Sequence, residues 1–311
     1  MRIQSFLECR RQLSLGAEKY SGGPMAVAQF RHIEVNPLSS SHAGAEVLGV
    51  DLRDGMKDSA VREELNRAFA NHCVIAIRDQ NLTAQQFYEV GEIFGDIFPQ
   101  HNSRFSVPDC PLIHYISNQD KFEDGRIYIP GEGYHTDHSN DAVPPKATML
   151  FAVKLPNTGG DTQFINMYRA YETLSEAMKK RIESLQCVHV YQSKYSERKL
   201  MALAGEKKTV VPTQVIHPLV RTHPVTGKKA LYINPIRIES ILGMDDGDAQ
   251  NLLGELLEHS IDLSNEYRHK WRSGDVVIWD NRCLMHKANG DYPVEEVRYL
   301  YRLMVKGEAP V

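Results

Sequence analysis

The sequence has little cysteine, no long apolar run and no strong charge of either sign. Its five cysteines are odd in number and scattered, without a CxxC pair, which argues against a disulfide framework or a thiolate zinc site and fits a reducing cytosol. No apolar stretch reaches the length of a membrane span. With a net charge of −4, the chain lacks the positive electrostatic field expected of a nucleic-acid-binding protein. We therefore expect a cytoplasmic protein without a membrane or nucleic-acid partner.

The start of the chain lacks the continuous apolar segment of a secretory signal, since residues 1–20 carry several charged side chains. The breaker-rich stretch Ser21-Gly22-Gly23-Pro24 precedes Met25. We expect residues 1–24 to be a loosely structured extension, with Met25 as an alternative start, and residues 25–311 to form a single domain. The composition, with 42% hydrophobic and 24% charged residues, is that of a globular protein able to bury a core. We also expect a homo-oligomer.

Apolar periodicity predicts many short strands and a few helices. The predicted strands are 30–35, 44–52, 74–77, 112–117, 148–153, 159–165 (a turn and then a strand), 188–190, 215–220, 230–234, 275–279 and 298–305. The predicted helices are 60–72, 82–94, 167–185 and 248–263, with a helical turn at 236–243. This order favours a mainly β fold with helical additions, an antiparallel jelly roll. There is no βαβ alternation and no GxGxxG after a strand, so a Rossmann fold is a poor fit.

A histidine and an aspartate separated by one residue follow a glycine-containing stretch, in His135-Thr136-Asp137. In an extended segment residues i and i+2 point to the same face, so both side chains can meet one metal ion. The best third ligand is His286, which follows the predicted strand 275–279. Two histidines and one carboxylate form the facial triad of non-haem Fe(II) oxygenases. Taken alone, the pair is equally explained by a solvated turn.

Two arginines, Arg298 and Arg302, lie on one face of the last predicted strand, with Leu300 between them. On an inner face they would need anionic partners, which implies ligands that carry carboxylates or similar groups. On an exposed edge strand they would merely face water. The segment Gly159-Gly160-Asp161-Thr162 brings a hydroxyl out of a tight turn, and by itself is also an ordinary β-turn.

The segment 99–133 contains several prolines and one predicted strand. A long irregular region just before the HxD pair is more often functional than idle, so it is predicted to be a lid or a wall of a substrate pocket. A surface excursion is the alternative. Three other histidines, His72, His189 and His259, are predicted to be packing or surface residues.

In their order and spacing these segments resemble the taurine and aryloxyalkanoate (TauD/TfdA-like) family of Fe(II)/2-oxoglutarate-dependent dioxygenases. The resemblance runs from about Phe30 to Gly307. It rests on the motifs Gly49-Val50-Asp51-Leu52, His135-Thr136-Asp137, Pro144-Pro145, Gly159-Gly160-Asp161-Thr162, the helix from Met167 to Ser175, Trp279-Asp280-Asn281, His286, Asp291-Tyr292, Arg298 and Arg302. It implies a single domain with a double-stranded β-helix core.

The resemblance also implies a role for each site residue. The residues that would bind Fe(II) are His135, Asp137 and His286. Arg298 and Thr162 would bind the distal carboxylate of 2-oxoglutarate, whose other end chelates the iron. Arg302 would hold the head of a small anionic substrate, because a guanidinium suits a carboxylate or sulfonate. The implied reaction uses O2 and 2-oxoglutarate, releases succinate and CO2, and hydroxylates the substrate.

The carboxylate Asp137 fits hydroxylation, because related halogenating enzymes have a small residue in its place. The chain departs from the family where Arg298 follows His286 by one residue more than usual. The extra residue falls near 293–296, where a loop can absorb it.

Three further residues are candidate substrate contacts. Asn140 stands where relatives often have an aromatic residue. His101 and Gln100 compete for the place of a histidine that helps to bind a sulfonate, and His138 directly follows the triad aspartate. A turn histidine with its own hydrogen bond is the alternative for His138.

The helix from Met167 and the run from Arg298 to Arg302 look closer to aryloxyalkanoate-type relatives, which favours a carboxylate substrate with a hydrophobic body. Taurine-like sulfonates and alkyl sulfates stay open. A zinc-dependent hydrolase or isomerase on a similar barrel is the runner-up, because the same three ligands also bind zinc. The arginine pair and Thr162 argue against it. The intact triad argues against a non-catalytic protein that binds 2-oxoglutarate as a signal.

Overall fold

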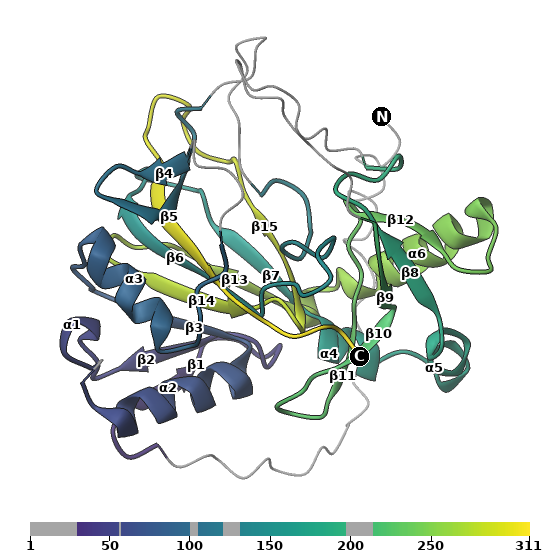
Figure 1. Ribbon diagram of the computed structural model, residues 1–311, viewed down its shortest axis with the longest axis horizontal. Coiled ribbons are helices and arrows are strands. Elements are labelled where there is room, and N and C mark those ends of the chain that lie inside the picture. The colour runs from purple at the N-terminus through teal and green to yellow at the C-terminus, as the bar shows by residue number, and fades with distance from the viewer. Residues whose placement is uncertain (1–29, 56, 100–104, 121–130, 197–213) are drawn as a thin grey trace, which may run out of the picture. The chain divides into compact units, whose positions relative to one another are not determined.

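The computed structural model describes residues 30–55, 57–99, 105–120, 131–196 and 214–311 (Figure 1). Residues 31–311 form one compact unit. The predicted extension, residues 1–24, lies outside the described part of the chain, so the extension and its boundary stay predictions. No helix in the described ranges combines the length and the apolar character needed to cross a membrane.

The largest sheet has eight strands in the order β1-β2-β3-β14-β6-β16-β5-β4. Their bounds are β1 Glu34–Pro37, β2 Ala45–Leu48, β3 Val74–Ile77, β4 Ser106–Val107, β5 Cys110–Ser117, β6 Ala147–Lys154, β14 Val276–Asp280 and β16 Tyr299–Val305. Neighbouring strands are antiparallel except β2 and β3. Strands β3 and β14 are buried along their whole length, because helices cover one face and the second sheet covers the other.

A second sheet in the order β13-β7-β15 packs against the first. Its strands are β7 Thr162–Asn166, β13 Glu266–His269 and β15 Leu284–Ala288. The contact between the sheets includes Phe164 of β7 and Trp279 of β14, whose ring centroids are 5.5 Å apart. The predicted mainly β fold with helical additions is therefore confirmed.

Helices α2 (Ser59–His72) and α3 (Ala84–Glu92) pack on the large sheet. They begin close to the predicted starts at residues 60 and 82. Asp58 caps α2 by accepting from Ala60 N, and Thr83 and Gln86 form a complete capping box at the start of α3. Phe87 of α3 packs against the sheet through Phe151, with ring centroids 5.9 Å apart. A short helix, α1 (Leu52–Gly55), precedes them.

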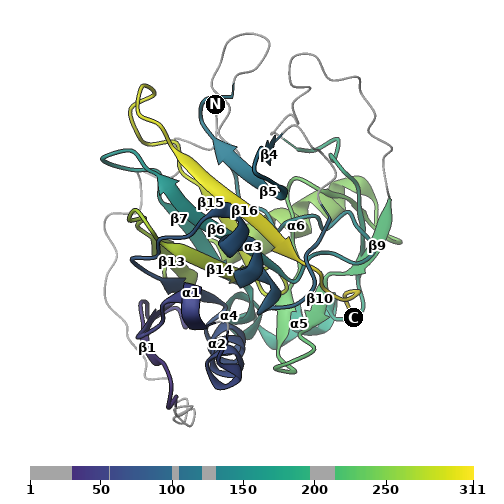
Figure 2. The same cartoon turned by 60° about the vertical axis from the view of Figure 1, so that its left-hand side comes forward.

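An insertion between β7 and β13 supplies a three-stranded sheet, a hairpin and helices (Figures 1 and 2). Its elements are α4 Met167–Glu172, α5 Glu176–Ile182, β8 Gln186–His189, β9 Val215–Pro218, β10 Val220–Thr222, β11 Lys229–Leu231, β12 Ile238–Ile241, α6 Asp246–Ser260 and the 3-10 turn η2 Leu263–Asn265. In both views α6 and β9 lie to the right of the strands labelled β6 and β14, whereas α2 lies below these strands. This insertion forms one wall of the site described below.

The prediction of one helix over residues 167–185 was wrong. The chain forms two helices, because the Thr173 hydroxyl donates to Arg169 O and Ser175 caps a new helix by accepting from Met178 N. Such local side-chain bonds compete with helix continuation, which apolar periodicity does not detect.

Other differences concern strand pairing. Residues 236–243 were predicted to be a helical turn, but Ile238–Ile241 is a strand paired with β8, which buries two β-branched side chains. The predicted strands 215–220 and 230–234 pair with each other only as β10 and β11, since β9 pairs with β8 instead. Strands β13 and β15 were not predicted. The predicted strand at 30–35 begins later, at Glu34.

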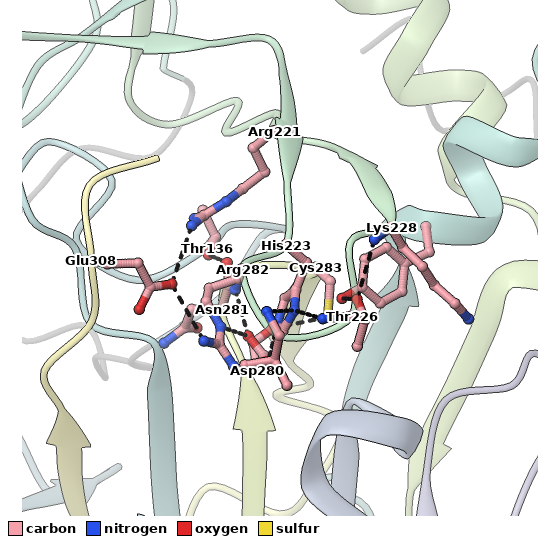
Figure 3. Close-up of polar contacts among 12 residues, drawn as sticks. Thr136, Arg221, His223, Thr226, Lys228, Asp280, Asn281, Arg282, Cys283 and Glu308 are labelled. Carbon is pink, nitrogen blue, oxygen red and sulfur yellow. Dashed lines mark hydrogen bonds and ion pairs between the residues drawn. The ribbon is translucent and has the colours of Figure 1, made fainter. Parts of the chain in front are cut away.

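A buried polar network lies at the end of β14 (Figure 3). The Asp280 carboxylate accepts from Arg282 at 2.8 and 2.7 Å and lies 3.1 Å from Nε2 of His223. Burial alone would raise the pKa of Asp280, but Arg282 and His223 lower it well below its ordinary value. Glu308, near the C-terminus, lies 3.3 Å from Arg282 and 3.7 Å from the buried Arg221. The network thus connects Glu308, close to the C-terminus, with the end of β14, the strand that precedes His286 in the chain.

We expect Asp280→Asn to lower the free energy of unfolding by about 3–5 kcal/mol, because it leaves the buried Arg282 without its main counter-charge. Chemical denaturation measures this loss. The control Glu308→Gln removes a carboxylate that is 40% exposed and should cost less than about 1 kcal/mol. Equal losses in the two variants would contradict the prediction.

Candidate functional site

The three predicted metal ligands, His135, Asp137 and His286, come together and are all buried. One ligand atom from each lies within 4.8 Å of the other two. Nε2 of His135 is 3.8 Å from Asp137 Oδ1, and Nε2 of His286 is 3.7 Å from Asp137 Oδ2. Two imidazoles and one carboxylate at this spacing fit a divalent metal that keeps open coordination positions.

A backbone bridge aligns the two histidines. His135 N donates to His286 O at 3.0 Å and His286 N donates to His135 O at 2.8 Å, so segments far apart in sequence form a short antiparallel pair. Nδ1 of His135 lies 2.9 Å from Gly133 O. Because a carbonyl oxygen only accepts, this contact places the proton on Nδ1 and leaves Nε2 to bind metal.

A chain of buried side chains holds the Asp137 carboxylate. The Thr148 hydroxyl donates to Asp137 Oδ2 at 2.6 Å, and Asn281 Nδ2 donates to Thr148 Oγ1 at 2.9 Å. Trp279 Nε1 in turn donates to Asn281 Oδ1 at 3.1 Å. The Trp279-Asp280-Asn281 motif therefore acts on the site through Thr148, which sequence reasoning did not single out.

Arg302 lies against the same carboxylate, since its Nη2 donates to Asp137 Oδ1 at 3.1 Å. Burial would raise the pKa of Asp137, but Arg302 and then His286 lower it well below its ordinary value. Asp137 is therefore ionised at neutral pH, as a metal ligand must be.

A second group of buried residues positions the segment that follows the HxD pair. Nδ2 of Asn234, from the insertion, donates to Thr136 O at 2.8 Å and to Ser139 Oγ at 2.9 Å. His189 Nδ1 lies 3.0 Å from the same hydroxyl. His189 is fully buried, so its prediction as a packing residue holds, but it also supports the metal-binding segment. No local motif in the sequence marks Asn234, because it is brought here by the tertiary fold.

Arg298 and Thr162 meet in the same cavity, as predicted. Arg298 Nε donates to Gly160 O at 3.2 Å, while Nη2 is buried without a hydrogen-bond partner among the described residues. Burial lowers the pKa of Arg298 to about 10, so it is still charged at neutral pH. Trp271 Nε1 donates to Thr162 Oγ1 at 3.0 Å, which leaves the hydroxyl proton of Thr162 to donate elsewhere. A buried cation beside an O–H donor fits a carboxylate ligand.

Hydrogen bonds hold the loop before Arg298. Glu296 O accepts from Asn118 Nδ2 at 2.8 Å, and Arg298 N donates to Asn118 Oδ1 at 3.0 Å. The residue that follows β5 therefore holds the backbone just before β16. Asp291 Oδ1 accepts from Gly160 N at 2.8 Å. Arg298 therefore still reaches the cavity.

The cavity has a volume of about 230 Å³. Its walls combine the metal ligands, basic and imidazole groups, and apolar or aromatic side chains: Phe105, His114, Tyr115, Ile116, Ser117, Asp120, Gly131, His135, Asp137, His138, Leu150, Thr162, Tyr191, Ile236, Arg237, Trp279, His286, Ala288, Arg298 and Arg302. The described part of residues 99–133 thus supplies a pocket wall. The segments 100–104 and 121–130 lie outside the described residues, so their role as a lid stays a prediction.

The candidate substrate contacts differ in whether they line the cavity. Arg302 and His138 line the cavity. His138 also lies 3.3 Å from Asp141, so both interpretations of this histidine apply. Asn140 is buried but is not among the lining residues, so nothing in the structure supports a contact from it. His101 lies outside the described residues.

The polar wall residues that sequence reasoning missed include His114 and Arg237. His114 stands inside the predicted strand 112–117, where a histidine among apolar residues is a weak signal. Arg237 was hidden by the wrong prediction of a helical turn, because its position depends on the pairing of β12 with β8.

The model of the taurine catabolism dioxygenase TauD, TfdA family matches residues 34–304 of the chain. The chain belongs to this family. It is 31% identical over 285 residues to the alpha-ketoglutarate-dependent sulfate ester dioxygenase of Pseudomonas putida, an overlap of 90% of this chain and 91% of the relative. It is also 31% identical over 291 residues to the alpha-ketoglutarate-dependent 2,4-dichlorophenoxyacetate dioxygenase of Cupriavidus pinatubonensis, covering 90% and 99%.

Among solved structures, a taurine dioxygenase from Burkholderia xenovorans matches with a TM-score of 0.74 at 32% identity, covering 90% of this chain and 93% of that one. Membership of the TauD/TfdA family confirms the resemblance stated from the sequence. It also confirms the jelly-roll core and the class of 2-oxoglutarate-dependent dioxygenase.

We expect Thr148→Val, which keeps the side-chain shape and removes the hydroxyl bonded to Asp137, to weaken metal binding about 10–100-fold, because ligand orientation depends on such outer bonds. Anaerobic calorimetry with Fe(II) or Mn(II) measures the affinity. Thr173→Val, at an exposed position, is the matched control. An unchanged affinity in Thr148→Val would show that this bond does not position the ligand.

Proposed function

We propose that the protein is an Fe(II)/2-oxoglutarate-dependent dioxygenase that hydroxylates a small organic anion with an apolar body. The observation that carries this proposal is the pairing, in one cavity, of a facial ligand set with a buried arginine whose Nη2 has no hydrogen-bond partner in the described part of the chain. A metal hydrolase has no need for the second feature, which suits the distal carboxylate of a co-substrate.

Each group has a separate task in this proposal. His135, Asp137 and His286 would hold Fe(II), while Arg298 and Thr162 would bind 2-oxoglutarate. Bound Fe(II) would supply the activation of O2, coupled to the loss of CO2 from 2-oxoglutarate and the formation of succinate. The chain itself orients the ligands through Thr148 and the backbone bridge, and the surrounding buried side chains limit access of water.

The substrate side of the cavity combines Arg302 and His138 with the aromatic side chains Phe105, Tyr115 and Tyr191. This lining supports an anionic head and a hydrophobic body, so an aryloxyalkanoate-type carboxylate is one candidate. Sulfonates and sulfate esters are the other, and the relatives' names include both kinds of substrate. The cytoplasmic location and the homo-oligomer stay predictions.

The first experiment is anaerobic addition of Fe(II) and 2-oxoglutarate to the metal-free protein. We expect the weak visible charge-transfer band of chelated Fe(II) in the wild type and its loss in His135→Ala, because one imidazole ligand is removed. The absorption spectrum measures both. If zinc binds tightly while 2-oxoglutarate gives no band, the hydrolase takes the place of the dioxygenase.

We expect Arg298→Gln to raise KM for 2-oxoglutarate about 10–100-fold, which corresponds to the loss of one hydrogen bond to a charged group. Arg298→Lys should recover part of the loss, because it keeps the charge but not the planar fork. Steady-state succinate formation gives the constants. Arg181→Gln, whose side chain is 52% exposed on α5, serves as control. An equal change in that control would refute the assignment.

A further inference from the structure

A second arginine, Arg237, lines the same cavity as Arg302. Arg237 comes from the insertion, just before β12, whereas Arg302 lies on β16 of the large sheet. Both arginines line the cavity together with His138. The two guanidinium groups therefore belong to different walls of one cavity.

Arg237 is held in place before any ligand arrives. Its Nη1 donates to Tyr191 O at 2.8 Å, and the guanidinium carbon lies 5.2 Å from the centroid of the Tyr191 ring. Its backbone N donates to Asn234 O at 3.0 Å, and its O accepts from Val190 N at 2.9 Å. Asn234 also bonds to Thr136, next to the metal ligands, so Arg237 is fixed relative to the metal site. A cation positioned in this way loses little freedom on binding an anion.

His114 adds to this group from β5, the neighbour of β16 in the large sheet. It lies directly opposite Arg302 in the β5–β16 register, and it is 6% exposed. Its Nε2 is buried without a hydrogen-bond partner in the described ranges. Burial, and then the charge of Arg302, lower its pKa to about 4, so the ring is neutral and can present one N–H donor.

We propose that Arg237 and His114 extend the anion site of Arg302 into one that surrounds the substrate head group, so that these two residues decide which head group is accepted. The inference rests on the proposed function. A planar carboxylate presents two oxygens in one plane, which a single guanidinium satisfies. A tetrahedral sulfonate or sulfate presents three oxygens in different directions, which suits donors on separate walls. The surrounding donors therefore favour tetrahedral oxyanions over carboxylates with the same tail.

The test uses hexanoate, pentane-1-sulfonate and pentyl sulfate, which share an apolar tail and differ in the head group. Each is titrated calorimetrically into the full-length protein loaded anaerobically with Fe(II) and 2-oxoglutarate. In the wild type we expect the sulfonate and the sulfate to bind about tenfold more tightly than hexanoate. Arg237→Gln should weaken those two about 10–100-fold, as expected for the loss of a charge-assisted hydrogen bond, and hexanoate less than about threefold.

Two further variants separate recognition from folding. Arg237→Lys, which keeps the charge and replaces Arg237→Gln if that variant does not fold, should retain an intermediate preference. His114→Phe should reduce the preference without changing the affinity for 2-oxoglutarate. Arg181→Gln removes an exposed arginine outside the cavity and should change none of the affinities.

The inference is overturned if no anion binds to the wild type, or if Arg237→Gln weakens all three anions equally or none of them. The charge-transfer band separates this failure from that of the proposed function. A band with unchanged intensity in Arg237→Gln, together with any of these results, would leave the dioxygenase site intact and reject only the head-group role.

Discussion

The antiparallel backbone pair between His135 and His286 is the contact on which the site depends. Its two hydrogen bonds, of 3.0 and 2.8 Å, join a segment that enters from the loop after β5 to a strand of the second sheet. Side-chain ligands alone would leave each histidine on a separate, independently moving support. Because the backbone bonds fix the spacing first, the metal-binding atoms are set by the sheets and not by a flexible loop.

Several charged side chains are buried around this pair. They determine the charge of the site, and their removal from water opposes folding. Asp137, Asp280 and Arg298 are all nearly excluded from water. The first two are ionised because arginines lie beside them. Arg298 differs, since one of its nitrogens is buried without a partner in the described structure, and a carboxylate ligand would supply that partner. A bound carboxylate would thus complete the site.

The sequence was sufficient for the features that depend on local patterns or on motif order. The clustering of His135, Asp137 and His286, the shared cavity of Arg298 and Thr162, and the mainly β fold all followed from spacing and from the family resemblance. Features created by long-range pairing did not follow. Strand β12 was taken for a helical turn because its partner, β8, is distant in sequence, and the same error hid Arg237.

The insertion between β7 and β13 carries both Asn234, which donates to Thr136 O between the candidate metal ligands, and Arg237, which lines the cavity. Only two residues separate them along the chain. Replacing this stretch to change substrate recognition would therefore also disturb the residue that supports the candidate metal site. An engineer who grafts the loop of a relative onto this scaffold would have to transplant the anchoring asparagine together with the residues that choose the substrate.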